Sequence, residues 1–228
     1  PTADLYTYSL QTFDLLQVSD GPSQAFQPVW SPDGKWIVFG GASTFGSGAG
    51  ATITRIWAAL SDGSDIESMY KPSEPGDERI IGWVDSETFL VYSWDAACGW
   101  RNLRTFNIEN TISSVLWPDS FQAVAYDPIN AVALVSSNED TCSPASGIGT
   151  YLIPTDGTTP LKMLESPENQ LIWSDETETF LATSDFTSRM IAITSSGQTI
   201  DLNMPQGAKS FPSAAPGTNQ LAWPGDAL

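Results

Sequence analysis

The sequence contains no histidine, so this chain cannot supply a Ser-His-Asp or Cys-His catalytic group, or an imidazole ligand for a metal. Basic residues are also scarce: 9 Lys and Arg stand against 27 Asp and Glu, and the formal net charge is −18. Such a surface repels phosphate backbones and anionic lipid headgroups. We therefore expect no nucleic-acid partner and no membrane insertion. The remaining chemistry would use carboxylates, Tyr, Lys or a metal held by oxygen, and we predict no metal and no cofactor.

Cysteines and long apolar runs are few as well. Cys98 and Cys142 are too few for a disulfide-rich scaffold, but they allow one bridge. No apolar stretch approaches the ~18 residues of a membrane-spanning helix, and the N-terminus lacks the pattern of a signal peptide. The chain begins at Pro1 without Met, which indicates a portion of a longer protein. Its 228 residues, 41% of them hydrophobic, are enough to bury a substantial core.

The sequence does contain a repeated pattern, in which an aromatic or apolar residue precedes a turn and a short apolar run. The clearest copy has Trp30, the turn Ser31-Pro32-Asp33-Gly34 and the run Ile37-Val38-Phe39, with Pro, Asp and Gly where a type I turn favours them. Four further copies follow it: 80–92, 123–135, 171–182 and 211–223. The copies recur at about 40–50 residues, which is the spacing of propeller blades.

A second set of short segments lies between these copies, most of them with alternating polar and apolar residues. The set comprises 5–10, 55–60, 103–108, 151–154 and 190–193. Each segment leads to a turn, and a further short strand follows, as at Leu161–Leu164. Alternation over so few residues favours half-exposed strands. Each repeat is therefore predicted to form four antiparallel strands.

The stretch from Trp30 to Phe39 resembles the WD40-like (PD40) repeat of TolB-type β-propellers. The resemblance implies a ring of radial four-stranded blades. Proteins of that family act as periplasmic or cell-surface interaction platforms, or as propeller domains beside a peptidase.

We therefore predict an all-β fold: a single five-bladed β-propeller domain over residues 1–228, made of four-stranded antiparallel blades. The four complete blades are expected at 27–71, 79–117, 122–165 and 169–204. The closing blade would combine the N-terminal strands of 4–18 with the C-terminal strands of 210–224, so that no sheet edge stays open. The alternative is a fragment of a six- or seven-bladed ring.

The links between the second and third strands of each blade are the candidate binding sites. They are expected at 40–54, 93–102, 136–149 and 184–188, and three of them are longer than a hairpin needs. Their candidate partner-binding residues are Phe45, Trp94, Asp95, Trp100, Arg101, Glu139 and Asp140. Trp94 and Trp100 could stack on a sugar ring or on a partner's apolar side chain, or they could cover their own loop.

Cys98 and Cys142 fall in equivalent links on neighbouring blades, so we predict a disulfide between them. The chain-entropy model gives such a bridge roughly 4 kcal/mol of stabilisation. A disulfide would place the protein outside the cytoplasm. Two free thiols in a reducing cytosol are the alternative.

Three carboxylates, those of Glu78, Asp119 and Glu168, are expected at the mouth of the central channel. They could hold a cation, or act as acid and base of a glycoside hydrolase. The alternative is solvated charge at the rim. By contrast, four acids are assigned a structural role in the turns: Asp33, Asp85, Asp127 and Asp175.

The predicted function is that of a non-catalytic, extracytoplasmic propeller that binds a protein or glycan partner through its long-loop face. We expect a monomer or a part of a larger chain, and no enzyme. The alternative is a carboxylate-pair glycoside hydrolase with its site at the channel mouth.

Overall fold

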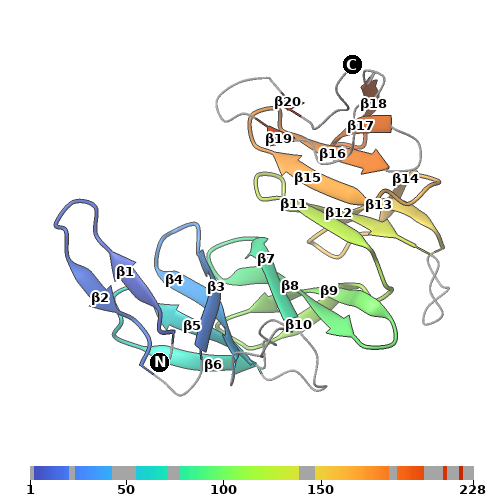
Figure 1. Ribbon diagram of the computed structural model, residues 1–228. Helices are drawn as coiled ribbons and strands as arrows, with labels where there is room; N and C mark the ends of the chain where they lie inside the picture. The colour runs from blue at the N-terminus through green and yellow to red at the C-terminus, as the bar shows by residue number, and fades with distance from the viewer. Residues whose placement is uncertain are drawn as a thin grey trace. The chain divides into compact units, whose positions relative to one another are not determined.

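The computed structural model in Figure 1 describes most of the chain as β-sheet. The described residues are 3–20, 24–42, 55–70, 78–138, 147–184, 189–202, 213–214 and 221–222. Among these residues every regular element is a β-strand, and none forms a helix that could cross a bilayer. The chain divides into two compact units: Pro1–Ala97 with Arg101–Val115, and Cys98–Trp100 with Leu116–Leu228.

The first unit holds a strand pair and most of two four-stranded sheets (Figure 1). The pair is β1 (Tyr6–Tyr8) and β2 (Leu15–Gln17). Sheet 1 consists of β3 (Gln24–Trp30), β4 (Trp36–Ala42), β5 (Arg55–Leu60) and β6 (Ile66–Tyr70). Sheet 2 consists of β7 (Glu78–Trp83), β8 (Thr88–Asp95), β9 (Gly99–Asn107) and β10 (Ser113–Trp117).

The second unit has two four-stranded sheets and a further strand pair. Sheet 3 consists of β11 (Ala123–Asp127), β12 (Val132–Ser137), β13 (Gly149–Pro154) and β14 (Leu161–Leu164). Sheet 4 consists of β15 (Gln170–Ser174), β16 (Thr179–Ser184), β17 (Arg189–Thr194) and β18 (Thr199–Leu202). The pair is β19 (Ser213–Ala214) and β20 (Leu221–Ala222).

Each four-stranded sheet follows the chain in order, so that each strand lies beside the next one in the sequence. The predicted all-β class and its four-stranded antiparallel repeat are therefore confirmed. The predicted closing blade would join β1 and β2 to β19 and β20, which belong to different units. Closure of the ring, and a single domain over the whole chain, stay predictions.

The turns between first and second strands are held by aspartates, as the sequence predicted. Asp33 Oδ1 accepts hydrogen bonds from Ser31 Oγ at 2.6 Å and from the Lys35 backbone N–H at 3.1 Å. In the corresponding turn of sheet 2, Asp85 Oδ1 accepts from the backbone N–H of Glu87 and Thr88. These aspartates replace backbone acceptors and fix the strand reversal.

Sheets 1 and 2 are packed together by apolar side chains from the middle of their strands. Val38 of sheet 1 lies in one core cluster with Phe89, Val91 and Phe106 of sheet 2. Phe89 is 1% exposed, and its ring centroid lies 5.4 Å from that of Phe106. The Trp83 indole N–H donates to the Val29 carbonyl oxygen across the interface at 3.1 Å. This packing makes the two sheets mutually supporting.

The second unit repeats this arrangement between sheets 3 and 4. Leu134 and Leu152 of sheet 3 share a core cluster with Phe180, Ile191 and Ile193 of sheet 4. Phe180 is fully buried, as its counterpart in sheet 2 is. The repeated aromatic and branched residues therefore act as the predicted core.

Candidate functional site

The predicted long link at 93–102 is wrong, because most of these residues belong to strands. β8 continues through Asp95 and β9 begins at Gly99, so only residues 96–98 join them. Asp95 Oδ1 accepts a hydrogen bond from the Ala97 backbone N–H at 2.8 Å, and Gly99 takes a φ of 75°. Aspartate as a local acceptor and glycine in the left-handed region make the reversal tight.

Four predicted binding residues are thus placed on strands beside this hairpin: Trp94, Asp95, Trp100 and Arg101. Trp94 is 42% exposed near the end of β8. Trp100 is half-buried, and its carbonyl oxygen accepts a hydrogen bond from the Phe121 backbone N–H at 2.8 Å. Trp94 is therefore attached to a hydrogen-bonded strand and not to a loop.

The other predicted binding residues, Phe45, Glu139 and Asp140, lie outside the described residues. Cys142 lies outside them as well. Cys98 carries no free thiol. The Cys98–Cys142 bridge stays a prediction.

The carboxylates predicted at the channel mouth are buried. Glu78 is 1% exposed, and Asp119 and Glu168 are each 3% exposed. The alternative interpretation of these residues as solvated rim charge is therefore wrong. A carboxylate removed from water needs a cation, hydrogen-bond donors or a proton. Their surroundings decide which of these each residue has.

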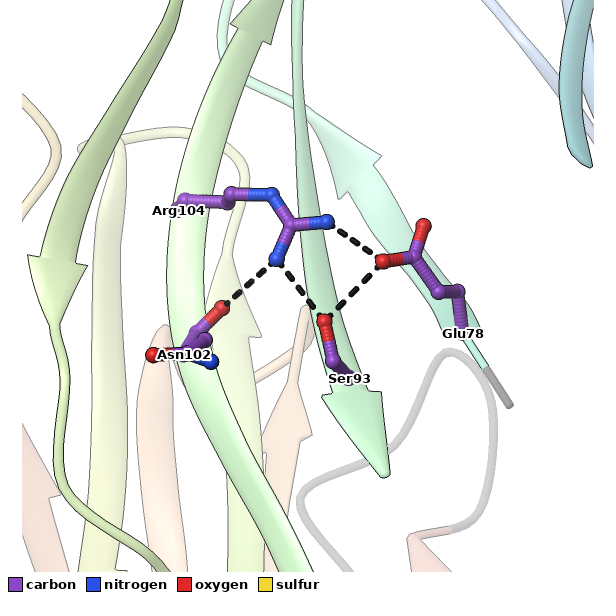
Figure 2. A network of polar contacts seen from close by, with 4 residues as sticks. All are labelled: Glu78, Ser93, Asn102 and Arg104. Carbon is purple, nitrogen blue, oxygen red and sulfur yellow. Dashed lines mark hydrogen bonds and ion pairs between the residues drawn. The ribbon is translucent and has the colours of Figure 1, made fainter. Parts of the chain in front are cut away.

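Glu78 forms a buried ion pair with Arg104, which Figure 2 shows between β7, β8 and β9. Arg104 Nη2 lies 2.5 Å from Glu78 Oε1, and its Nη1 donates to Ser93 Oγ at 2.8 Å. The Ser93 hydroxyl in turn donates to Glu78 Oε1 at 3.0 Å. One carboxylate oxygen thus receives both a guanidinium and a hydroxyl donor.

Asn102 completes this network through its backbone. Its φ of 56° lies in the left-handed region, which Asn tolerates better than most residues. Its carbonyl oxygen accepts from Arg104 Nη1 at 3.4 Å (Figure 2). The guanidinium is therefore held by three strands of sheet 2.

Glu168 has different surroundings in the second unit. Its backbone N–H donates to Ser136 Oγ at 2.7 Å, and its carbonyl oxygen accepts from Gln122 Nε2 at 2.9 Å. Its carboxyl oxygen Oε1 accepts from Ser166 Oγ at 3.1 Å. Burial raises the pKa of Glu168 above its usual range, although the Ser166 hydrogen bond and the charge of Arg189 oppose this.

The two glutamates therefore offer different chemistry. Glu78 Oε1 is engaged by Arg104 and Ser93, so this oxygen takes part in an ion pair. Glu168 keeps its proton to a higher pH, as a general acid requires. Within the described part of the chain, no group of three or more His, Cys, Asp or Glu side chains could hold a metal ion.

The sequence analysis overlooked Arg104. A signal was present, because Arg104 is the one charged residue in the otherwise β-rich segment 103–108. A cation inside a buried strand requires a buried partner. The partner itself, Glu78, is 26 residues earlier in the sequence and could not be identified from that segment.

No protein-family model and no curated protein sequence matches this chain. Solved structures of similar fold include the following three. The nidogen/laminin complex gives a TM-score of 0.53 and 12% identity over 87% of this chain and 70% of the other. An oligogalacturonate lyase in complex with manganese has a TM-score of 0.57 and 12% identity, over 83% of this chain and 52% of the lyase chain. TolB from Acinetobacter baumannii has a TM-score of 0.51 and 12% identity, over 86% of this chain and 47% of the TolB chain.

These structures establish a propeller-type fold for the chain. They confirm, at the level of the fold, the resemblance to TolB-type propellers that residues 30–39 indicated. This chain spans about half the length of the lyase and TolB chains that it matches. At 12% identity the activities and partners of those proteins do not follow for this chain.

Proposed function

We propose that this chain is a non-catalytic, extracytoplasmic propeller scaffold that binds a protein or glycan partner through the face where second and third strands are joined. The observation that carries the proposal is Trp94, a large aromatic side chain left 42% exposed near the end of a rigid strand. Trp presents a wide apolar surface at little cost in conformational entropy, so it stacks on sugar rings and anchors protein interfaces.

Further contact residues are proposed in the corresponding links of the other sheets. Phe45 lies between β4 and β5, and Glu139 and Asp140 lie between β12 and β13. Asp95 and Arg101 would add polar contacts beside the Trp94 hairpin. In this arrangement the sheets hold the backbone still, and side chains at the strand ends select the partner.

The extracytoplasmic location is proposed from cysteine chemistry. Cys98 carries no free thiol, and Cys142 is the only other cysteine in the sequence. A bridge between them would persist in an oxidising compartment. We propose that the chain acts as a monomer or as one domain of a larger protein.

The test compares three variants on a glycan array and in crosslinking to purified candidate proteins. Trp94→Ala, alone or with Trp100→Ala, should weaken binding at least about tenfold, as loss of an aromatic anchor does. Trp30→Ala is the matched control. Trp30 is 51% exposed, but it lies beside the first-to-second-strand turn, at the other end of sheet 1 from the proposed face. Equal affinity of the Trp94 variant and wild type would refute this binding face.

Glycoside hydrolysis is the second candidate, and the surroundings of Glu168 favour it. A buried carboxyl with a raised pKa suits the general acid of such a reaction. One of the structures of similar fold is a lyase acting on oligogalacturonate. Asp119, which belongs to the same unit, would have to act as the second carboxylate.

A panel of chromogenic glycosides tests the enzymatic alternative. If wild-type protein hydrolyses one of them, Glu168→Gln should abolish that activity while the protein stays folded. Asp119→Asn should also abolish it, with unfolding measured in parallel because this side chain is 3% exposed. Absence of hydrolysis by wild-type protein across the panel would remove the alternative.

A further inference from the structure

The fourth strand of each four-stranded sheet lies at an edge, and no strand among the described residues pairs with its outer side. Such an edge presents unpaired backbone N–H and C=O groups, which proteins commonly protect with a charged residue. Three of the four fourth strands contain one: Glu67 in β6, Lys162 in β14 and Asp201 in β18. The strand β10, with the sequence Ser-Ser-Val-Leu-Trp, contains none. Sheet 2 therefore has an edge without this protection.

The start of the β10 edge is both apolar and exposed. Ile112, which precedes the strand, is 61% exposed, and Val115 is 57% exposed. Ser113 and Ser114, which lie between them, are exposed as well. Because side chains alternate along a strand, Ile112 and Val115 lie on opposite faces of the sheet. A strand added at this edge would therefore gain apolar contacts on both faces.

The hydrogen bonds between β9 and β10 show which backbone groups of the edge point outwards. The Ile112 carbonyl oxygen accepts from the Asn107 backbone N–H at 3.0 Å, and the Ser114 carbonyl oxygen accepts from the hydroxyl of a β9 threonine at 3.4 Å. Ile112 and Ser114 therefore direct their carbonyl groups towards β9. This direction alternates along an antiparallel strand, so Ser113 and Val115 direct their backbone groups away from β9. Each of these two offers an N–H donor and a C=O acceptor to a further strand.

Acidic side chains gather at the end of sheet 2 where β10 begins. The Ile108 backbone N–H donates to the Glu87 carbonyl oxygen at 2.8 Å, so the turn before β10 lies against the turn before β8. These two turns carry Asp85, Glu87 and Glu109, whose side chains are all exposed. Neither turn contains Lys or Arg. The edge therefore begins beside a negative potential that attracts cationic side chains.

We propose that the outer edge of β10 binds an extended segment of a protein partner, which adds a fifth antiparallel strand to sheet 2. The segment would place apolar side chains beside Ile112 and Val115, and Lys or Arg at its C-terminal end. An antiparallel strand runs opposite to β10, so its C-terminal end reaches the turn that carries Glu109. In this mode of recognition the main-chain hydrogen bonds provide affinity and the side chains provide selectivity.

This surface is separate from the binding face proposed above. The edge strand β10 is two strands away from β8, which carries Trp94. A variant at the β10 edge can therefore fail to bind its peptide while the Trp94 face keeps its own partner. The two proposals succeed or fail independently.

A second copy of this chain is a poorer occupant of the edge than a basic segment. Pairing two β10 strands would bring the apolar residues together, but each copy carries a formal net charge of −18. Self-repulsion of this size opposes association. A segment that ends in Lys or Arg gains from the same charges, so charge complementarity favours a cationic partner.

The test follows the fluorescence anisotropy of a labelled peptide, Thr-Val-Thr-Val-Lys-Arg, on addition of the whole chain. Val115→Lys places a charge on the edge and should weaken binding at least about tenfold. Val115→Pro should do the same without changing the charge, because proline removes the outward N–H and is tolerated at such an edge position. Ile200→Lys is the matched control: Ile200 is 53% exposed on the fourth strand of sheet 4, so the same added charge should leave binding unchanged.

The acidic end of the site is tested separately. Replacing Glu87 and Glu109 together by Gln should weaken binding about threefold to tenfold and reduce its dependence on salt. A peptide that ends in Glu-Glu instead of Lys-Arg should bind more weakly than the basic one. Equal affinity of the basic peptide for wild type and for both Val115 variants would overturn the proposal, as would the absence of binding at about 1 mM peptide.

Hydrogen exchange at the Val115 amide distinguishes the possible occupants. In the free chain this amide should exchange rapidly, and saturating peptide should slow it at least about tenfold, as a new strand hydrogen bond does. Slow exchange in the free chain that becomes fast on dilution would show that a second copy covers the edge. Slow exchange at every concentration would show that a segment of this chain covers it. Either result would overturn the proposal.

Discussion

Replacing Arg104 alone should destabilise the protein far more than replacing Arg104 together with Glu78. Arg104→Met leaves the Glu78 carboxylate 1% exposed and without its guanidinium, with the Ser93 hydroxyl as its remaining side-chain donor in Figure 2. Leaving such a charge uncompensated costs about 3–5 kcal/mol. At about 2–4 °C per kcal/mol for a chain of this size, Tm should fall by roughly 6–20 °C.

The double variant Glu78→Leu, Arg104→Met should recover most of this loss. Apolar residues of similar volume often replace a buried ion pair at no net cost, because the desolvation of both charges disappears. The Ser93 hydroxyl would then lose both partners, which costs about 1–3 kcal/mol. The double variant should therefore be clearly more stable than Arg104→Met.

Urea unfolding followed by tryptophan fluorescence measures these differences, and hydrogen exchange of the peptide 78–95 assigns them to sheet 2. Arg189→Met is the control, because this arginine also lies on the third strand of its sheet but is 48% exposed and pairs with an exposed acid. It should cost no more than about 1 kcal/mol. If Arg104→Met also cost no more than about 1 kcal/mol, the interpretation of Glu78–Arg104 as a desolvated ion pair would be refuted. The same would follow if the double variant were no more stable than Arg104→Met.

Two further predictions concern single positions. Burial raises the pKa of Asp127, but hydrogen bonds, the first from Ser195, hold that pKa below its ordinary value of 3.8. The ionised carboxylate therefore stabilises the fold above about pH 4, and this stabilisation disappears on further acidification. Asp127→Asn should cost about 1–3 kcal/mol in urea unfolding at pH 7 and less at pH 3; an equal loss at both would contradict this. Gly149 has a φ of +145°, and a Cβ at this position would lie 2.5 Å from the Leu164 carbonyl oxygen, so Gly149→Ala should cost about 2 kcal/mol or more. A Cβ at Gly157 would meet nothing within 4 Å, so Gly157→Ala should cost about 1 kcal/mol. Equal Tm shifts would contradict this difference.

The features that the sequence predicted well are local ones. Asp33 and Asp85 accept hydrogen bonds from backbone N–H groups two residues further along the chain, so the adjacent sequence is enough to predict their role. The same holds for the apolar runs around Phe89 and Phe180, which form the centre of each interface. Four-stranded repeats follow directly from these two kinds of signal.

The link at 93–102 was misjudged because it contains Asp95 and Gly99, which are depleted in strands. Hydrogen bonding between β8 and β9 nevertheless extends the sheet almost to Cys98. Strand pairing depends on the neighbouring strand, and the composition of one segment does not show how far that pairing extends. The tight turn at Asp95 and Gly99 is consistent with the sequence, but so was a longer loop.

The buried carboxylates show the same limit more sharply. Glu78 and Arg104 are 26 positions apart, and only the fold brings them together. The sequence placed Glu78 and Glu168 at the channel mouth as cation ligands, catalytic acids or solvated charge. It did not indicate that Arg104 would pair with Glu78 inside sheet 2.

These observations separate two parts of each repeat that are under different physical constraints. The middle of every strand packs against the next sheet, so its residues must stay apolar and of similar size, as Phe89 and Phe180 do. Polar groups are tolerated outside this packed centre, such as the exposed pair of Arg189 with Asp201 at the start of β17. Because the core does not constrain the strand ends, differences between repeats should concentrate there. Binding residues are therefore to be sought at the strand ends, where Trp94 lies.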